Sequence, residues 1–214
     1  AQLSRGLGDV YKRQEIVNGK AKDYDMVIAT GSNNTNRYFE YYFGKTPHLF
    51  RKNRTSVAII DNQTTENDLN KLSKDVFDYF GLGCRSVTKL YIEKGFDINS
   101  IFKSFYHAKE VMNHVKYMNN YDYNKAIYLL EDISFLDNGF MILRENENLH
   151  SPVSVVNYEY FENIVELNEK LNYIQDEIQC RVGVGGVAYG TAQNPSLSDY
   201  ADGVDTIQSV SYTH

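Results

Sequence analysis

Cysteine, positive charge and long hydrophobic runs are all scarce in this sequence. The 214 residues include two cysteines, too few for the disulfide framework of a small secreted domain, so each cysteine must be explained by packing or by reactivity. No run reaches the roughly 18 apolar residues of a membrane-spanning helix, and the first residues lack the apolar core of a secretory signal. We therefore expect a cytoplasmic protein without an integral membrane segment.

The charge balance of the chain is acidic, with 28 acidic residues, 22 basic residues and a formal net charge of −6. Because phosphate backbones and anionic membranes are bound by basic surfaces, this balance argues against a nucleic-acid partner and favours small-molecule chemistry. It also favours an ordinary aromatic core over a base-stacking surface for the tyrosine-rich run YMNNYDYNKAIY, residues 117–128. A hydrophobic share of 42% is enough for one domain, or for one domain plus a piece of another.

The two ends of the chain differ from its interior. The opening AQLSRGLGDVYKRQ, residues 1–14, and the closing SVSYTH, residues 209–214, have no hydrophobic period. They resemble translated adapter sequence at the ends of fragmentary reading frames. We interpret them as a non-native leader and a non-native tail and leave them out of the fold prediction.

Short apolar strands alternate with amphipathic helices through the interior, which predicts a layered α/β architecture. Thr64 or Thr65 is expected to cap one of these helices. The region 43–54 could join two domains. Strands are expected before Gly31 and over 56–60, 87–92, 139–145, 152–159 and around Cys180, and helices over 33–44, 64–80, 98–118, 121–132 and 160–175.

Cys84 is the first candidate for chemistry. It lies between Gly83 and Arg85 in FGLGCRS, in an expected turn between a helix and a strand. A glycine-flanked turn lets a substrate carbonyl approach both the sulfur and the local backbone N–H groups, and Arg85 could stabilise the thiolate. A buried structural cysteine is the alternative interpretation, which the glycine context alone does not exclude. Packing is the expected role of Cys180.

The second candidate is TGSNNT, residues 30–35, at the end of the first expected strand. Backbone N–H groups at a helix start, with the hydroxyls of Ser32 and Thr35, form a plausible phosphate-binding element. An ordinary strand-to-helix turn with a capping serine is the alternative. No cluster of cysteine and histidine has the spacing of a zinc site, so no metal is expected.

The motifs together are more specific than either candidate alone. ATGSNNT, SVAIID, FGLGC and VTKLYI occur in the order and approximate spacing of the aldehyde dehydrogenase superfamily, and SPVSVVNYEYFENIVELNEKLN resembles its proline-strand-helix segment. The chain resembles more closely the acyl-CoA reductases related to the fatty-acid reductase subunit of bacterial bioluminescence. That resemblance spans nearly all of residues 15–208 and rests on RYFEYYFGKTPHLFRKNRTSVAI, FGLGCRSVTKL, SFLDNGFM and AQNPSLSDYADGVDT.

The resemblance implies an aldehyde dehydrogenase-like α/β fold. Residues 15–50 would be the C-terminal part of a Rossmann-like cofactor-binding domain, and residues 51–208 would be a three-layer α/β/α catalytic domain that holds the cysteine. The chain would then be a piece of a longer enzyme, and without the first strands of the cofactor domain it would be inactive alone. Because superfamily members usually form dimers or tetramers, the whole protein is expected to be a homo-oligomer.

The resemblance also implies the reaction. An acyl-CoA or acyl-carrier thioester would be reduced by NADPH to the aldehyde, with Cys84 holding the acyl group as a thioester. The residues that would line the cofactor site are Thr30, Gly31, Ser32 and Asn33.

One departure from the family bears on the direction of the reaction. Aldehyde-oxidising members place a glutamate in a Glu-Leu-Gly-Gly run shortly before a strand, where this chain has FRKN, residues 50–53. Because that glutamate activates water, its absence favours reduction. Three alternatives stay open: an NAD-dependent aldehyde-oxidising dehydrogenase of the same fold, a non-catalytic α/β module that binds a partner protein, and a cysteine hydrolase.

Overall fold

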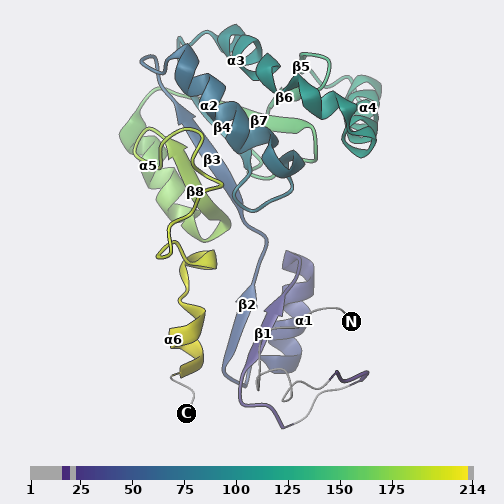
Figure 1. The fold of residues 1–214 in the computed structure, drawn as a ribbon, viewed down its shortest axis with the longest axis vertical. Coiled ribbons are helices and arrows are strands. Elements are labelled where there is room, and N and C mark those ends of the chain that lie inside the picture. The colour runs from purple at the N-terminus through teal and green to yellow at the C-terminus, as the bar shows by residue number, and fades with distance from the viewer. Residues whose placement is uncertain (1–15, 20–22, 212–214) are drawn as a thin grey trace.

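The computed structural model describes residues 16–19 and 23–211 and divides them into a small and a large unit (Figure 1). The expected leader, residues 1–14, and the last three residues of the expected tail lie outside the described residues. The small unit is a parallel β-α-β unit in which a helix connects two neighbouring strands. Its elements are β1 (Val27–Thr30), α1 (Asn33–Phe43) and β2 (His48–Arg51).

The large unit is built on a six-stranded sheet with the order β5-β6-β7-β4-β3-β8. All neighbouring strands are parallel except the short edge pair β5 and β6. All six residues of β3 are buried, as expected for a strand covered on both faces. The strands are β3 (Thr55–Ile60), β4 (Val87–Glu93), β5 (Leu136–Asp137), β6 (Ile142–Glu145), β7 (Val155–Phe161) and β8 (Ile178–Gly183).

Helices cover the two faces of this sheet. One face packs against α2 and α3 through a core that includes Leu72 and Phe105, and the other packs against α5 through Leu167 and Leu171. The predicted three-layer α/β/α architecture is therefore confirmed. The helices are α2 (Glu66–Phe77), α3 (Ile98–Phe105), α4 (Val115–Leu130), α5 (Ile164–Tyr173) and α6 (Thr206–Ser211), with 3₁₀ turns η2 (Asp78–Gly81), η3 (Tyr106–Asn113), η4 (Gln175–Glu177) and η5 (Ala201–Gly203).

The sequence predicts Thr64 or Thr65 as the N-cap of α2, and in the structure the N-cap is Thr65. The Thr65 hydroxyl accepts a hydrogen bond from the Asp68 N–H, and the Asp68 carboxylate accepts one from the Thr65 N–H. This reciprocal capping box satisfies two N–H groups that a helix start otherwise leaves unpaired. Thr64 instead donates its hydroxyl to the Asp61 carboxylate.

The predicted boundary between the helices over 98–118 and 121–132 is wrong. The chain forms α3, then the 3₁₀ segment η3, and α4 then begins at Val115 and runs through residue 121 without a break. His114 causes the restart: its backbone is extended, and its Nδ1 accepts a hydrogen bond from the Tyr117 N–H. Its ring also stacks on Phe80 at a centroid distance of 4.1 Å. This contact links the helix start to the segment that precedes Cys84.

The tyrosine-rich run largely faces inward, as predicted. Tyr117, Tyr121 and Tyr128 are buried, and Tyr123 is exposed.

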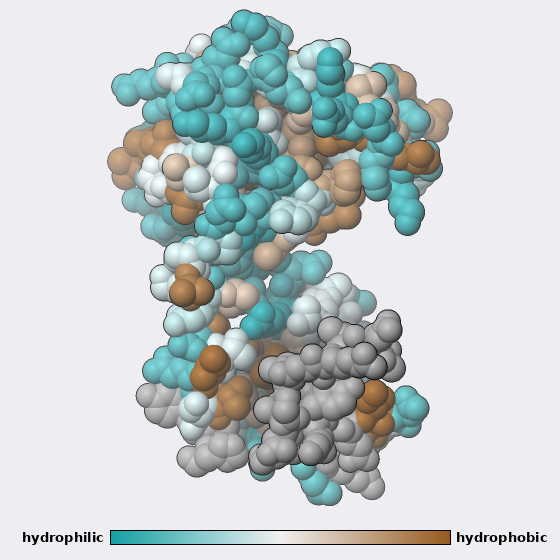
Figure 2. All heavy atoms as spheres, in the orientation of Figure 1, coloured by the Kyte–Doolittle hydropathy of each residue, from teal (hydrophilic) through white to brown (hydrophobic). Residues whose placement is uncertain are grey.

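The visible surface of the large unit in Figure 2 is mainly hydrophilic, with separate apolar areas. In the part of the chain that the structure describes, no helix combines the length and the apolar character needed to cross a bilayer.

Candidate active site

Cys84 lies in the turn Gly81–Ser86, which connects η2 to β4, and its side chain is exposed. The turn is closed by two hydrogen bonds: the Ser86 N–H donates to the Gly83 carbonyl at 2.9 Å, and the Gly83 N–H donates to Ser86 Oγ at 3.2 Å. The Ser56 hydroxyl of β3 donates to the Cys84 carbonyl at 3.0 Å. The thiol is therefore presented to solvent from a backbone that is held on both sides.

The backbone N–H groups of Cys84 and Arg85 have no hydrogen-bond partner among residues 16–19 and 23–211. Unpaired backbone donors stabilise a developing oxyanion during acyl transfer when they point at the carbonyl oxygen. The Arg85 guanidinium is committed elsewhere, because its Nη1 donates to the Ala192 carbonyl at 3.1 Å. The structure thus places backbone donors at Cys84 and uses the Arg85 side chain to hold a distant segment.

The approach to this turn has an unusual backbone. Tyr79 and Phe80 both have left-handed conformations, with φ of 58° and 60°, and Gly81 follows with φ of 72°. Each non-glycine residue in this region costs about 1–2 kcal/mol. Strain of this kind concentrates at functional sites, and the Phe80 side chain is held in a stack on His114.

The second cysteine has a different environment. Cys180 lies on β8 with 7% of its surface exposed and belongs to the core that contacts α2. Burial raises the pKa of its thiol, which disfavours the thiolate. The expectation that Cys180 has a packing role is confirmed.

These environments predict selective alkylation. In the folded chain, iodoacetamide should modify Cys84 at least about tenfold faster than Cys180, because only Cys84 is accessible and the thiolate is the reactive form. Peptide mass spectrometry at successive times measures both rates, and unfolding in urea should make them similar. Equal rates in the folded chain would contradict the structure of this site.

The second candidate element lies at the top of the small unit, where β1 ends at Thr30 and α1 begins at Asn33. Ser32 caps α1, and its hydroxyl accepts a hydrogen bond from the Thr35 N–H at 3.2 Å. Gly31 has a steric reason to be glycine, because a Cβ there would lie 2.9 Å from the Thr35 side chain. The capping role of Ser32 is thus observed.

This turn is suited to a phosphate-bearing cofactor. The helix it opens has eleven residues and no acidic side chain in its first turn, so its positive N-terminal end is not neutralised. Asn36, on the same helix, donates its side-chain amide to the carbonyls of Gly31, Ser32 and Arg51. Its buried Oδ1 has no partner among the described residues and can still accept a hydrogen bond.

The two candidate elements lie at opposite ends of one short connection. The Gly31 N–H donates to the Arg51 carbonyl at the end of β2, and the Thr55 hydroxyl at the start of β3 donates to the Ser86 carbonyl. Four residue steps separate Arg51 from Thr55, so their Cα atoms lie at most about 14 Å apart. This connection passes between the two units in Figure 1. The structure therefore brings the turn 30–33 and the Cys84 turn to the same region.

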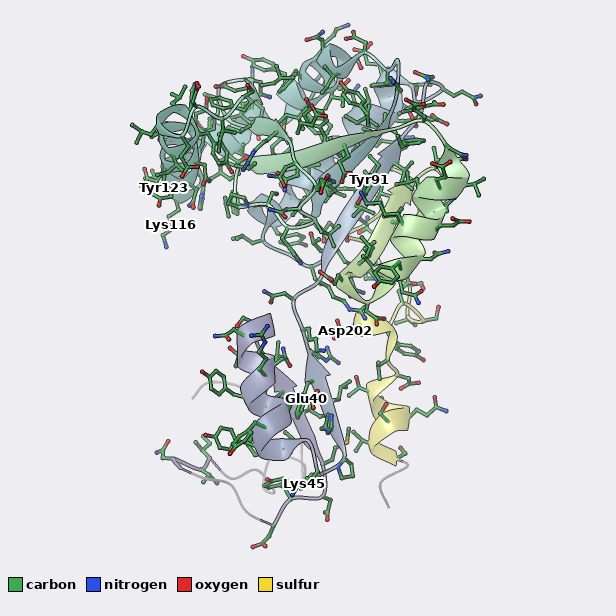
Figure 3. The ribbon with its side chains drawn as sticks, turned by 180° about the vertical axis from the view of Figure 1, so that it is seen from behind. Glu40, Lys45, Tyr91, Lys116, Tyr123 and Asp202 are labelled. Carbon is green, nitrogen blue, oxygen red and sulfur yellow. The ribbon has the colours of Figure 1, made fainter. Side chains whose placement is uncertain are left out.

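Arg51, at the end of β2, and Arg54, just beyond it, share one acidic partner. Arg51 Nε lies 3.7 Å from Asp202 Oδ2, Arg54 Nε lies 3.4 Å from Asp202 Oδ1, and Arg51 Nη2 donates to the Thr206 hydroxyl. Figure 3 shows Asp202 between the two units. Within the described part of the chain, no hydrogen bond or ion pair joins a carboxylate to the turn Gly81–Ser86.

The segment 188–194 was missed by the sequence analysis. It reaches the Cys84 turn twice, through the Ala192 carbonyl that accepts from Arg85 and through the Gln193 amide, which donates to Ser86 Oγ at 3.3 Å. The only signal was that Ala192 and Gln193 open the run AQNPSLSDYADGVDT, which resembles the acyl-CoA reductases. A separation of 107 residues along the chain leaves no local pattern from which the contact can be inferred.

The comparisons with known proteins agree with this architecture. No family model and no curated protein matches the chain. Among solved structures it is similar to an indole-3-acetaldehyde dehydrogenase bound to NAD⁺, with a TM-score of 0.52 and 11% identity over 82% of this chain and 41% of that one. It is also similar to the aldehyde dehydrogenase KauB from Pseudomonas aeruginosa, with a TM-score of 0.53, 11% identity and the same coverage.

A third similar structure is the gamma-glutamyl-gamma-aminobutyraldehyde dehydrogenase from Burkholderia cenocepacia, with a TM-score of 0.52 and 9% identity over 74% of this chain and 39% of that one. Identities this low support a shared fold and do not assign a reaction. The chain spans about two fifths of the length of these structures. The predicted aldehyde dehydrogenase-like α/β fold is confirmed on that basis.

Proposed function

We propose that this chain carries the cysteine-bearing part of an oxidoreductase that reduces acyl thioesters to aldehydes, with Cys84 as the nucleophile. The observation that carries the proposal is the turn Gly81–Ser86, in which an exposed thiol stands beside two unpaired backbone N–H groups. The strand-to-helix turn at residues 30–33 supports it, because a second element suited to phosphate lies across a connection of four residue steps.

The acyl-transfer step follows from these groups. The Cys84 thiolate attacks the carbonyl carbon of an acyl-CoA or acyl-carrier thioester, a carbon–sulfur bond forms, and the carbonyl π electrons move to oxygen. The N–H groups of Cys84 and Arg85 donate hydrogen bonds to that oxyanion. When the carbonyl re-forms, the bond to the original sulfur breaks and the carrier leaves as a thiolate. The acyl group is then held on Cys84 as a thioester.

The cofactor implied by this proposal is NADPH, held at Thr30, Gly31, Ser32 and Asn33. When bound, the reduced nicotinamide supplies the hydride that converts a thioester to an aldehyde. The chain's own contribution is to receive phosphate groups at the start of α1, with Ser32 and Asn36 fixing the turn.

The proposed direction is reduction. Hydrolysis of the acyl-enzyme needs a carboxylate to activate water, and the resemblance sets FRKN, residues 50–53, where aldehyde-oxidising members have their Glu-Leu-Gly-Gly run. The exposed side of the Cys84 turn has no hydrogen-bonded carboxylate among the described residues. The acyl group would therefore persist on Cys84 until hydride arrives.

The direction is tested in the native protein that contains this chain. Its NADPH oxidation with a long-chain acyl-CoA should exceed its NAD⁺ reduction with the matching aldehyde by at least about tenfold, because water activation is absent. Both reactions are followed by nicotinamide absorbance. Turnover of the aldehyde with NAD⁺ and none of the acyl-CoA with NADPH would reverse the proposed direction and leave the fold unaffected.

The non-catalytic alternative rests on a tyrosine-rich binding surface, and the structure does not favour it. Three of the four tyrosines in residues 117–128 are buried in the core. Cys84, which that alternative treats as structural, is exposed.

A further inference from the structure

A buried carboxylate next to the candidate site is not used in the proposed reaction. Asp75 lies on α2, and none of its surface is exposed. Its Oδ2 accepts a hydrogen bond from the Gly190 N–H at 2.6 Å, and its Oδ1 accepts one from the Ala192 N–H at 3.0 Å. Burial raises the pKa of this carboxyl. No arginine or lysine among the described residues forms an ion pair with it.

Burying a carboxylate without a cation is costly, so a group that persists there needs a compensating role. A neutral side chain would pack into the core between α2 and the sheet without this cost. The two N–H groups that Asp75 binds belong to the irregular segment after β8, which has no sheet partner to accept them. Asp75 therefore fixes the course of this segment, which we call the anchor segment, residues 188–194.

The anchor segment is pressed against α2 where Asp75 holds it. Gly190 has φ of 81°, and a Cβ at this position would lie 3.0 Å from Lys71 Cβ and 3.2 Å from the Lys71 carbonyl oxygen. Ala192 is fully buried. The backbone of residues 190–192 thus has little freedom to move while the hydrogen bonds to Asp75 persist.

The other side of the anchor segment holds the Cys84 turn. The Ala192 carbonyl accepts a hydrogen bond from Arg85 Nη1, and the Gln193 amide donates to Ser86 Oγ. Ser86 Oγ is the same atom that accepts from the Gly83 N–H and closes the turn. A continuous set of hydrogen bonds therefore runs from Asp75 through the anchor segment to residues on both sides of Cys84.

We propose that Asp75 is a positioning residue for Cys84. It holds the anchor segment so that Ala192 and Gln193 fix the turn from which the thiol is presented. The inference rests on the proposed function only in taking Cys84 as the nucleophile, because the positioning itself is measured on the thiol without any substrate.

The test measures the rate of Cys84 alkylation by iodoacetamide in the folded chain. The variants are Asp75→Asn, Gln193→Ala and the double variant. Asp122→Asn is the matched control, since it makes the same change at an exposed site on another helix, α4. We expect Asp75→Asn and Gln193→Ala each to change the rate by at least about threefold, the double variant to resemble the single variants, and the control to match the parent.

A merely structural role predicts a different result. Asp75→Asn would then lower thermal stability and leave the rate of Cys84 alkylation unchanged. Alternatively, the rate change in the double variant would equal the product of the changes in the two single variants. Either result overturns the proposal. If Asp75→Asn does not fold, Gln193→Ala decides: an unchanged Cys84 rate in that variant refutes the positioning path. If the double variant resembles the single variants but the native protein does not turn over acyl-CoA, the proposed function is refuted and the positioning role stands.

Discussion

Replacing Cys84 by alanine is expected to lower acyl-CoA reduction in the native protein by about 10⁴-fold or more. Without the thiolate no acyl-enzyme forms, and backbone donors alone retain little of the rate when the nucleophile is lost. The measurement is NADPH oxidation with a long-chain acyl-CoA at saturating concentrations of both. The turn should keep its structure, because Ser56 and Ser86 bind backbone atoms and not the sulfur.

Cys180→Ala is the matched control for that result. Removing a buried sulfur from the core should lower the free energy of unfolding by roughly 1–2 kcal/mol and leave turnover within about threefold of the parent. If Cys84→Ala retained a tenth of the parent activity, or if Cys180→Ala were the variant that lost activity, Cys84 would not be the nucleophile.

Replacing Gly183 by alanine is expected to cause a large loss of stability. Gly183 ends β8 with φ of 88°, and a Cβ there would meet the Ile59 carbonyl oxygen and would lie 2.5 Å from the Tyr189 hydroxyl. That hydroxyl donates to the same Ile59 carbonyl at 2.6 Å, so neither atom can move aside freely. The left-handed backbone and the crowding should together lower the free energy of unfolding by about 2–5 kcal/mol, measured by urea unfolding.

Gly185→Ala separates the two causes. Gly185 is in the same loop and also has a left-handed backbone, with φ of 72°, but nothing lies within 4 Å of a Cβ built on it. Its substitution should cost about 1–2 kcal/mol from the backbone alone. Equal losses for the two variants would show that crowding at Ile59 and Tyr189 is unimportant.

Elements that follow from a short run of neighbouring residues could be predicted from the sequence. The run SVAII lies within β3, because a central parallel strand needs apolar side chains on both faces. The alternation in VTKLYI lies within β4. The turn at Cys84 was also expected, since Gly81 and Gly83 precede the cysteine between a predicted helix and a predicted strand. Thr65 or its neighbour was foreseeable as a cap from residue type alone.

Contacts between distant segments were not predictable in the same way. The periodicity of residues 98–118 is compatible with a continuous helix, and only the use of the His114 ring as a helix cap and as a partner of Phe80 divides it. The short strand β2 exists because His48–Arg51 pairs in register with β1, which its composition does not reveal. In the sequence, Asp75 looks like an ordinary polar residue of an amphipathic helix. Its burial depends on the anchor segment, which is distant in the sequence and packs against it.

The central claim is that Cys84 accepts the acyl group, and the most direct test detects that bond. The native protein is incubated with a long-chain acyl-CoA without any nicotinamide cofactor, and its intact mass and its peptides are then measured. We predict a mass increase equal to one acyl group, located on Cys84, released by hydroxylamine and missing in Cys84→Ala. An unmodified protein, or an acyl group on Cys180 or another residue, would contradict it.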